Sequence, residues 1–458
     1  MKITTISLLL AVLCSFSIGE KEPSLLKIST NQRYFQTSDG APFFWMGDTG
    51  WLLFSKLKRH EAEHYLETRS QQGFNVIQVM LLHDVKLTNA YGDSALINGN
   101  VDMPLLTEGD AFADEEAYDY WDHVDYIINI AAQKGMYMAM VPVWGTHVRH
   151  GKLTAKQAET YAKWLALRYK NKSNIIWLNG GDTKGSDSTA IWNTIGNTLN
   201  KFDPNHLITF HPFGRTRSAS WFHNQPWLHF NMFQSGHRRY DQDDSETAYG
   251  QDNWRYVADD YALRPVKPTL DGEPSYESIP QGLHDTTQPY WNADDVRRYA
   301  YWSVFAGGCG FTYGHNAVMQ MHKTSDKNLS YGAREFWDEA LLAEGAEQMK
   351  WLKKLMYSKP YFERIPAPEL IIGEAGEKYD HIVATRGDSY AFIYTYTGRE
   401  FKVNLKPLQW KKMVSKWYNP RKGGYIAATY KSDDGVAIFD APGKTAEGND
   451  WVLVLEEG

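Results

Sequence analysis

Two carboxylic acids stand at the ends of two similar apolar runs. Asn174–Leu178 is followed by Asn-Gly-Gly and Asp182, and the run that begins at Lys267 ends in Asp-Gly and Glu273. Each run is typical of a buried strand that leads into a tight turn. Glycoside hydrolysis needs one carboxylic acid that protonates the departing oxygen and one carboxylate on the other side of the anomeric carbon. We therefore predict Asp182 as acid/base and Glu273 as nucleophile; surface or N-capping roles for both are the alternative.

Other polar and aromatic side chains gather at the ends of predicted strands. In a barrel of parallel strands, the carboxyl ends meet at one face, so these residues would surround the two carboxylates. Aromatic rings that stay partly exposed in a cleft stack on the apolar faces of sugars. For the histidines and tryptophans, a place in the core is the alternative. The predicted substrate-binding residues are Asp48, Trp51, Gln78, His83, Trp144, His147, Asn179, His211, Asn231, Gln234 and His315.

The elements that would position these residues are eight apolar segments separated mostly by helical patterns. The helices Arg59–Gly73 and Trp121–Gly135 both end on glycine, a common helix terminator. A last, long helix is predicted over Gly332–Met356. This alternation is typical of an α/β fold, a (β/α)8 TIM barrel. The predicted strands are Phe43–Gly47, Phe74–Leu82, Met136–Trp144, Asn174–Leu178, Leu207–His211, Leu228–Phe233, Pro268–Glu273 and Gly310–Tyr313.

After Pro360 the pattern changes to short alternating runs with turn signals such as Gly387-Asp388 and Asp434-Gly435 between them. Such a pattern predicts an all-β sandwich. We therefore divide the chain into a signal peptide (1–19), a catalytic barrel (20–360) and a C-terminal β-sandwich domain (361–458). The runs of the last domain are His381–Thr385, Tyr390–Tyr396, Phe401–Leu405, Val436–Phe439 and Trp451–Leu455.

The first nineteen residues have the organisation of a secretory signal peptide. Lys2 precedes the apolar run Ile6–Leu13, and small residues follow at Ser17 and Gly19. The run is too short to span a membrane. We expect an exported protein, periplasmic or extracellular. Cys14 lies in this segment, but Leu13 before it fits a lipoprotein cleavage site poorly, so a lipid anchor is the less favoured alternative.

Composition points to a saccharide rather than a nucleic acid as the partner. The formal net charge is −7, whereas a nucleic-acid-binding protein needs a basic face. Seventeen Trp and 28 Tyr exceed what a core requires, and a cleft lined with such rings suits an oligo- or polysaccharide. The predicted chemistry requires no metal and no cofactor.

Three features leave alternatives open. His60–His64 matches the zinc-protease pattern H-E-x-x-H, but the segment begins a charged outer helix without an evident third ligand, which favours a solvated helix face. Cys309 lies among glycines and is favoured as a small core residue over a nucleophile. A non-catalytic carbohydrate-binding protein on a barrel scaffold would keep the aromatic residues, but it does not account for both carboxylates.

The chain resembles the apiosidase-like glycoside hydrolases of family 140 over nearly all of its length after the signal peptide. Four segments carry the resemblance: the run Asp39–Trp51, the turn Asn179–Asp182, the motif Gly272–Pro274, and Trp417–Arg421. It implies a retaining hydrolase in which Asp182 is the acid/base and Glu273 the nucleophile. It further implies cleavage of apiose linkages in the side chains of the pectin rhamnogalacturonan II by a bacterium that degrades plant cell walls. A retaining glycosidase for another pentose or hexose linkage is the alternative. The last domain resembles one labelled as a collagen binder.

Overall fold

The computed structural model describes residues 23–242, 247–327 and 329–458. The predicted signal peptide over residues 1–19, with Cys14, lies outside the described residues. The first described strands form a small antiparallel sheet of β1 (Leu26–Ile28), β2 (Phe35–Thr37) and β3 (Pro42–Phe43). Phe35 packs its ring against Trp45 and Phe230, which stand at the amino ends of two barrel strands. This sheet therefore covers the end of the barrel opposite to the strand ends that carry Asp182 and Glu273.

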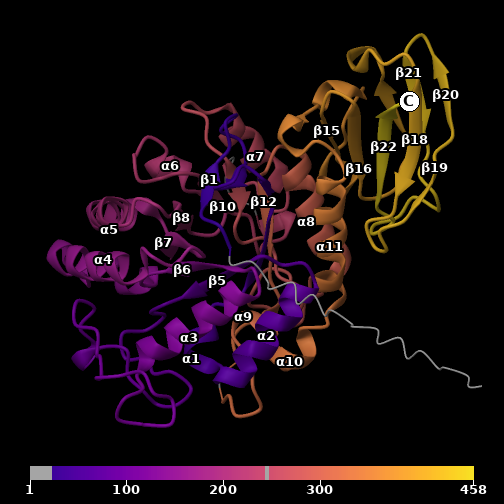
Figure 1. Ribbon diagram of the computed structural model, residues 1–458. Helices are drawn as coiled ribbons and strands as arrows, with labels where there is room; N and C mark the ends of the chain where they lie inside the picture. Colours follow the sequence, from indigo (N-terminus) through magenta and orange to yellow (C-terminus); the bar gives the residue numbers. More distant parts are fainter. Residues whose placement is uncertain (1–22, 243–246, 328) are drawn as a thin grey trace, which may run out of the picture.

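A parallel barrel forms the centre of the larger domain and confirms the predicted fold (Figure 1). The last barrel strand pairs in parallel with the first, which closes the sheet on that side. On the other side, the sixth strand is joined to the fifth by single contacts, such as His229 N to Ile208 O at 2.9 Å, rather than by a regular ladder. The barrel strands are β4 (Trp45–Thr49), β5 (Val76–Met80), β6 (Tyr137–Val141), β7 (Ile175–Thr183), β8 (Ile208–Pro212), β10 (Asn231–Gln234), β11 (Thr269–Asp271) and β12 (Gly310–Tyr313), and β9 (Thr216–Arg217) pairs antiparallel with β10.

Helices surround this barrel and bury their apolar faces against it (Figure 1). Capping boxes at Asp119, Thr154 and Asn292 fix the starts of three of the helices, since the capping side chain accepts from a free backbone N–H of the first turn. The helices of the barrel domain are α1 (Leu53–Lys56), α2 (Arg59–Gln71), α3 (Tyr120–Gln133), α4 (Ala155–Tyr169), α5 (Thr189–Phe202), α6 (Ala219–Phe222), α7 (Asn253–Ala262), α8 (Ala293–Phe305), α9 (Asn316–Met319), α10 (Trp337–Ala340) and α11 (Glu344–Tyr357).

The long helix predicted over Gly332–Met356 is wrong, because the segment forms the separate helices α10 and α11. The carbonyl of Leu341 between them accepts hydrogen bonds from Arg69 Nη1 at 3.0 Å and Gln72 Nε2 at 2.7 Å. The N–H of Gly345 donates to the carboxylate of Glu277 at 3.1 Å. Tertiary partners thus satisfy backbone groups that a continuous helix would pair internally.

The C-terminal part forms two antiparallel sheets, which confirms the predicted β-sandwich. Small apolar residues and rings of both sheets, Phe401, Trp417 and Phe439 among them, form a second core. The strands over 365–366, 371–372, 413–418, 425–427 and 430–433 were not predicted from the sequence. One sheet has the order β13 (Ile365–Pro366), β15 (Ile382–Arg386), β16 (Tyr390–Thr395), β22 (Trp451–Glu457), β18 (Met413–Tyr418), β19 (Tyr425–Ala427), and the other β14 (Ile371–Ile372), β17 (Phe401–Asn404), β21 (Val436–Phe439), β20 (Tyr430–Asp433).

The β-sandwich lies beside α8 and α11 of the barrel domain (Figure 1). The guanidinium of Arg297 on α8 forms a buried ion pair with Asp450, with Nη2 and Oδ1 2.9 Å apart. The rings of Trp254 on α7 and His381 stack at 4.0 Å between centroids. Arg297 also pairs with Asp294 at 2.6 Å and Asp450 with Arg421 at 3.1 Å, so a network of charges with matched hydrogen bonds fixes the relative orientation of the two domains.

Candidate active site

A bulge at the end of β7 presents Asp182. The pairing of β7 with β8 shifts register between Gly180 and Thr183, and Gly180, Gly181 and Asp182 have φ of 98°, 104° and 46°. A Cβ on Gly180 would lie 2.5 Å from the carbonyl oxygen of His211, and one on Gly181 2.5 Å from the ring of Trp144. Only glycine meets both demands, so the Gly-Gly pair turns the chain and places the Asp182 carboxyl at the mouth of the barrel.

Glu273 follows β11 and is held by its neighbours on both sides. Gln78 on β5 donates to the carbonyl of Gly272 at 2.6 Å, and the N–H of Gly236 donates to the carbonyl of Glu273 at 3.0 Å. A Cβ on Gly272 would lie 2.5 Å from Met232 Sδ. The backbone of Glu273 is thus fixed before any substrate binds, as a catalytic group requires.

Two histidines point their Nε2 atoms at the two oxygens of Glu273. His237 Nε2 lies 3.1 Å from Oε1 and His211 Nε2 lies 3.0 Å from Oε2. Each ring accepts a long backbone hydrogen bond at Nδ1, from Tyr276 N at 3.3 Å for His237 and from Asp182 N at 3.4 Å for His211. An Nδ1 that accepts leaves the proton on Nε2, so His237 directs an N–H to Oε1 of the carboxylate, whereas His211 Nε2 lies at ion-pair distance from Oε2 without hydrogen-bond geometry. The ring of His211 also links the backbone of Asp182 to the side chain of Glu273.

The two carboxyl groups have pKa values displaced in opposite directions. Burial and then the nearby charge of Glu273 raise the pKa of Asp182 to about 6. Burial would raise the pKa of Glu273 too, but the hydrogen bonds and charges of His211 and His237 outweigh it and lower the pKa to about 2. Between these values Asp182 is protonated while Glu273 is ionised. Two carboxyl groups in such different environments can serve one as an acid and the other as a nucleophile at the same pH.

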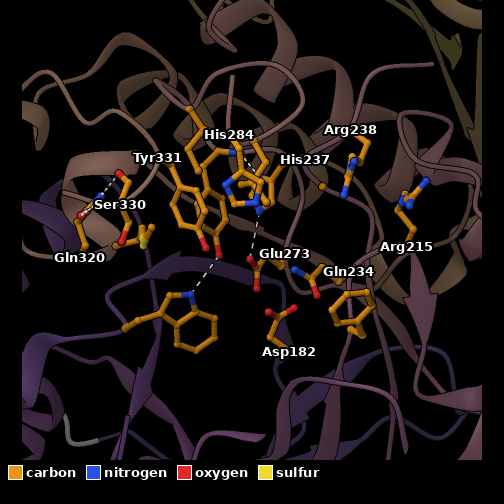
Figure 2. Close-up of a pocket in the computed structure, with 18 of the residues that line it drawn as sticks. Asp182, Arg215, Gln234, His237, Arg238, Glu273, His284, Gln320, Ser330 and Tyr331 are labelled. Atoms are coloured by element: carbon orange, nitrogen blue, oxygen red, sulfur yellow. Dashed lines mark hydrogen bonds and ion pairs between the residues drawn. The ribbon is translucent and has the colours of Figure 1, made fainter. Parts of the chain in front are cut away.

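A cavity of about 420 Å³ opens above the two carboxyl groups. Figure 2 shows Asp182 and Glu273 facing each other at its floor, Arg215 and Arg238 on one side beyond Gln234, and Gln320, Ser330 and Tyr331 on the opposite side. Trp51 donates from Nε1 to the hydroxyl of Tyr276 at 3.2 Å. Burial and then the charge of Glu273 raise the pKa of Tyr276 well above its ordinary value, so the phenol keeps its proton. The volume and the mixed aromatic and polar walls suit a sugar unit.

Of the predicted substrate-binding residues, the structure brings four to the carboxylates. Trp51, Trp144 and Gln234 line the cavity. His211 contacts Glu273 directly. The rings of Trp51 and Trp144 also pack against that of His211, with centroids 5.2 Å and 5.9 Å away.

The other seven predicted residues do not line this cavity, because their polar atoms bind the protein itself. Asp48 accepts from Arg69 at 2.7 Å, and Gln78, as described, supports Gly272. Asn179 donates to Trp192 O at 2.8 Å, and Asn231 Oδ1 lies 3.2 Å from His223 Nδ1. His315 caps α9, and burial lowers its pKa to about 3. His83 and His147 contact each other beside Asp84.

Several lining residues were not predicted from the sequence. His237 and Arg238 lie in the loop after β10, Tyr276 in the loop after β11, and Arg215 between β8 and β9. His237 follows a predicted strand by a few residues, which is the one signal that could have indicated it. The others depend on how loops fold over the barrel mouth.

The zinc-protease pattern lies in the charged helix α2. Glu61 accepts from Lys323 Nζ at 2.6 Å and also from the N–H of Lys58, while His60 and His64 are exposed. In the described part of the chain, no group of three His, Cys, Asp or Glu side chains is arranged to hold a metal ion. Cys309 is buried, its thiol donates to Thr269 O at 3.0 Å, and burial raises its pKa; it is a core residue.

Comparison with known proteins follows the same division of the chain. Residues 29–363 match the family model "Apiosidase-like, catalytic domain", and residues 365–456 match "Putative collagen-binding domain of a collagenase". A solved structure described as "Glycoside hydrolase" is 45% identical with a TM-score of 0.88, over 95% of this chain and 97% of that one. A "glycoside hydrolase family 5" structure from Bacteroides vulgatus ATCC 8482 is 43% identical with the same TM-score, over 94% and 93%.

More distant comparisons add the fold alone. A second glycoside hydrolase structure from the same organism has a TM-score of 0.61 at 14% identity, over 96% of this chain and 83% of that one. A search of curated proteins finds no match. Among the described helices, none is both long and apolar enough to cross a membrane.

The barrel, the paired carboxyl groups and these relatives define the class: the chain is a glycoside hydrolase whose substrate is a saccharide. It belongs to the apiosidase-like family, whose model covers most of its length.

Proposed function

We propose that the chain hydrolyses its substrate with retention of configuration, with Glu273 as nucleophile and Asp182 as acid/base. The observation that carries this proposal is the opposite displacement of the two pKa values, to about 2 and about 6, at carboxyl groups that face each other across one cavity (Figure 2). A glycosidase of this kind needs an ionised nucleophile and a protonated acid at the same pH.

In the first step, Glu273 attacks the anomeric carbon while Asp182 gives its proton to the departing oxygen. The glycosyl ester that forms removes the negative charge of Glu273. That charge is the second cause of the raised pKa of Asp182, so Asp182 becomes a stronger acid and then serves as the base that activates water. Water releases the sugar and restores both groups. A retaining mechanism predicts a separation of about 5–5.5 Å between the two carboxyl groups.

For the substrate, we propose apiose linkages in the side chains of rhamnogalacturonan II. The support is the apiosidase-like family model over residues 29–363. The pattern of residues 1–19, with Lys2 before an apolar run, supports export to the periplasm or the extracellular space, where a cell-wall glycan is accessible.

The test is release of sugar from rhamnogalacturonan II oligosaccharides by the wild type, Glu273→Gln and Asp182→Asn, with Glu159→Gln, an exposed acid on α4, as the matched control. Free apiose should appear with the wild type and the control. Glu273→Gln should lose roughly three or more orders of magnitude in rate. Release of a different pentose or hexose would replace the proposed substrate. Equal release by Glu273→Gln would overturn the nucleophile, and no release by the wild type across a panel of plant glycans would favour a binding protein.

A further inference from the structure

The side chain of Gln234 points into the barrel mouth beside the proposed nucleophile. Gln234 is the last residue of β10, which pairs in parallel with β11, the strand that leads to Glu273. The preceding residue, Phe233, points outward, where its ring stacks on that of Tyr256 of α7 at 5.1 Å between centroids. Because successive side chains of a strand alternate between its faces, Gln234 points inward. Figure 2 shows it next to Glu273, on the same cavity as Asp182.

Backbone hydrogen bonds hold Gln234 in this place. Its carbonyl accepts from Arg215 N at 2.7 Å, and the N–H of Gly272 donates to the carbonyl of Phe233 at 2.9 Å. The first bond ties Gln234 to the turn before β9, and the second ties β10 to the residue that precedes Glu273. The amide of Gln234 therefore extends from a backbone that is fixed relative to the nucleophile, as a substrate-binding group requires.

The amide oxygen of Gln234 has no hydrogen-bond partner among the described residues. Oε1 is buried, and the residue as a whole is 4% exposed. Asn179 in β7, by contrast, uses both ends of its amide within the protein: Nδ2 donates to Trp192 O at 2.8 Å and Oδ1 accepts from Gly180 N at 3.1 Å. Within the same described part of the chain, Gln78 Oε1 is unpaired too, but Gln78 does not line the cavity. A buried acceptor left unpaired is unfavourable, so Gln234 is suited to a ligand that donates a hydrogen bond.

We propose that Gln234 is a further substrate-binding residue, whose Oε1 accepts a hydrogen bond from the 2-hydroxyl of the sugar that Glu273 attacks. The inference rests on the proposed function, since it concerns the sugar of the glycosyl-enzyme. The anomeric carbon has two neighbours in the ring: the ring oxygen, which only accepts hydrogen bonds, and the carbon that carries the 2-hydroxyl, which donates. An acceptor beside the nucleophile therefore matches the side of the 2-hydroxyl. A hydrogen bond at this hydroxyl strengthens in the transition state of glycoside hydrolysis.

The two partners of this hydrogen bond can be removed separately, which isolates their interaction. A substrate without the 2-hydroxyl leaves Oε1 of Gln234 unpaired in a buried site, whereas Gln234→Met removes the acceptor and nearly keeps the volume. Loss of the 2-hydroxyl also changes the intrinsic reactivity of the glycoside. That change is the same for both enzymes, so it cancels when the two enzymes are compared on both substrates.

The probes are 4-nitrophenyl glycosides of apiose, arabinose, xylose and galactose, and the 2-deoxy form of the one that the wild type hydrolyses fastest. The quantity compared is the ratio of kcat/KM for that glycoside to kcat/KM for its 2-deoxy form. We expect this ratio to fall by about 10- to 100-fold in Gln234→Met and in Gln234→Ala. Gln71→Met is the matched control, because Gln71 is exposed on α2. Its ratio should equal that of the wild type.

The inference is overturned if folded Gln234→Met keeps the wild-type ratio, or if it lowers kcat/KM for both probes by the same factor. A melting temperature for each variant separates loss of the hydrogen bond from loss of folding. The expected fall on a glycoside other than the apioside would support the role of Gln234 and replace apiose as the proposed sugar. Hydrolysis of the apioside without that fall would overturn the role of Gln234 and leave apiose in place. If no aryl glycoside were hydrolysed, the inference and the proposed function would fall together.

Discussion

His237→Ala tests the claim that two histidines hold Glu273 ionised. The substitution removes the hydrogen bond from His237 Nε2 to Oε1 at 3.1 Å, while burial, which opposes ionisation, remains. A hydrogen bond to a charged group is worth about 1.5–3 kcal/mol, and one pKa unit corresponds to about 1.4 kcal/mol. The pKa of Glu273 should therefore rise by roughly one to two units, from about 2 to about 3–4.

The assay is the pH dependence of kcat/KM, which reports the ionisation of groups in the free enzyme. Glu273 must be ionised to attack, so activity falls as pH drops through its pKa. The wild type should stay on its plateau down to pH 4, whereas His237→Ala should lose half of its kcat/KM at a pH near 3–4. His237→Gln, which can restore a donor to the carboxylate, should show a smaller displacement.

The matched control is His64→Ala, since His64 is an exposed histidine on the outer helix α2. Its profile should equal that of the wild type. Melting temperatures identify any variant that loses activity by unfolding. If His237→Ala is folded and active but its acid limb matches that of the wild type, then His237 does not determine the pKa of Glu273.

Three further predictions concern the acid/base, the bulge and the domain contact. In the wild type, kcat/KM should fall as pH rises through about 6, because the acid form of Asp182 is lost there; a plateau to pH 8 would contradict this. Gly181→Ala should lower the melting temperature, because the left-handed backbone costs about 1–3 kcal/mol and the added Cβ also overlaps with Trp144. Gly424→Ala has open space around its added Cβ and should leave the melting temperature unchanged. Equal melting temperatures of the two variants would exclude this strain. Asp450→Ala should destabilise the protein by about 1.5–3 kcal/mol, because Arg297 loses two buried hydrogen bonds to Asp450 but keeps its ion pair with Asp294 at 2.6 Å. Asp434→Ala, which breaks an exposed pair with Lys406, should change thermal unfolding little by comparison.

The barrel and the positions of Asp182 and Glu273 could be predicted because both depend on local pattern. An apolar run followed by Asn-Gly-Gly or Asp-Gly predicts a strand and its turn, and parallel strands bring their carboxyl ends to one face. The direction of a side chain within that face could not be predicted. Asp48 ends a strand as Asp182 does, but its carboxylate points to Arg69 on α2. Successive side chains of a strand alternate between faces, so one residue of register decides between cavity and scaffold.

The remaining differences come from contacts between distant segments. His237 reaches Glu273 only because the loop after β10 docks on the end of β11, where Gly236 N donates to Glu273 O. Leu341 interrupts a helical pattern because Arg69 and Gln72, far along the chain, bind its carbonyl. In the β-sandwich, the exposed strands β19 and β20 lack the apolar alternation that a sequence pattern needs.

A search for a covalent intermediate on Glu273 examines the proposed nucleophile itself. Asp182→Ala should be incubated with an aryl glycoside of the sugar that the wild type releases, since a good leaving group needs no acid but the second step still needs the base. We expect a burst of released aryl alcohol and a glycosyl adduct that peptide mass spectrometry places on Glu273. Turnover with inverted configuration, or an adduct on another residue, would contradict this role of Glu273.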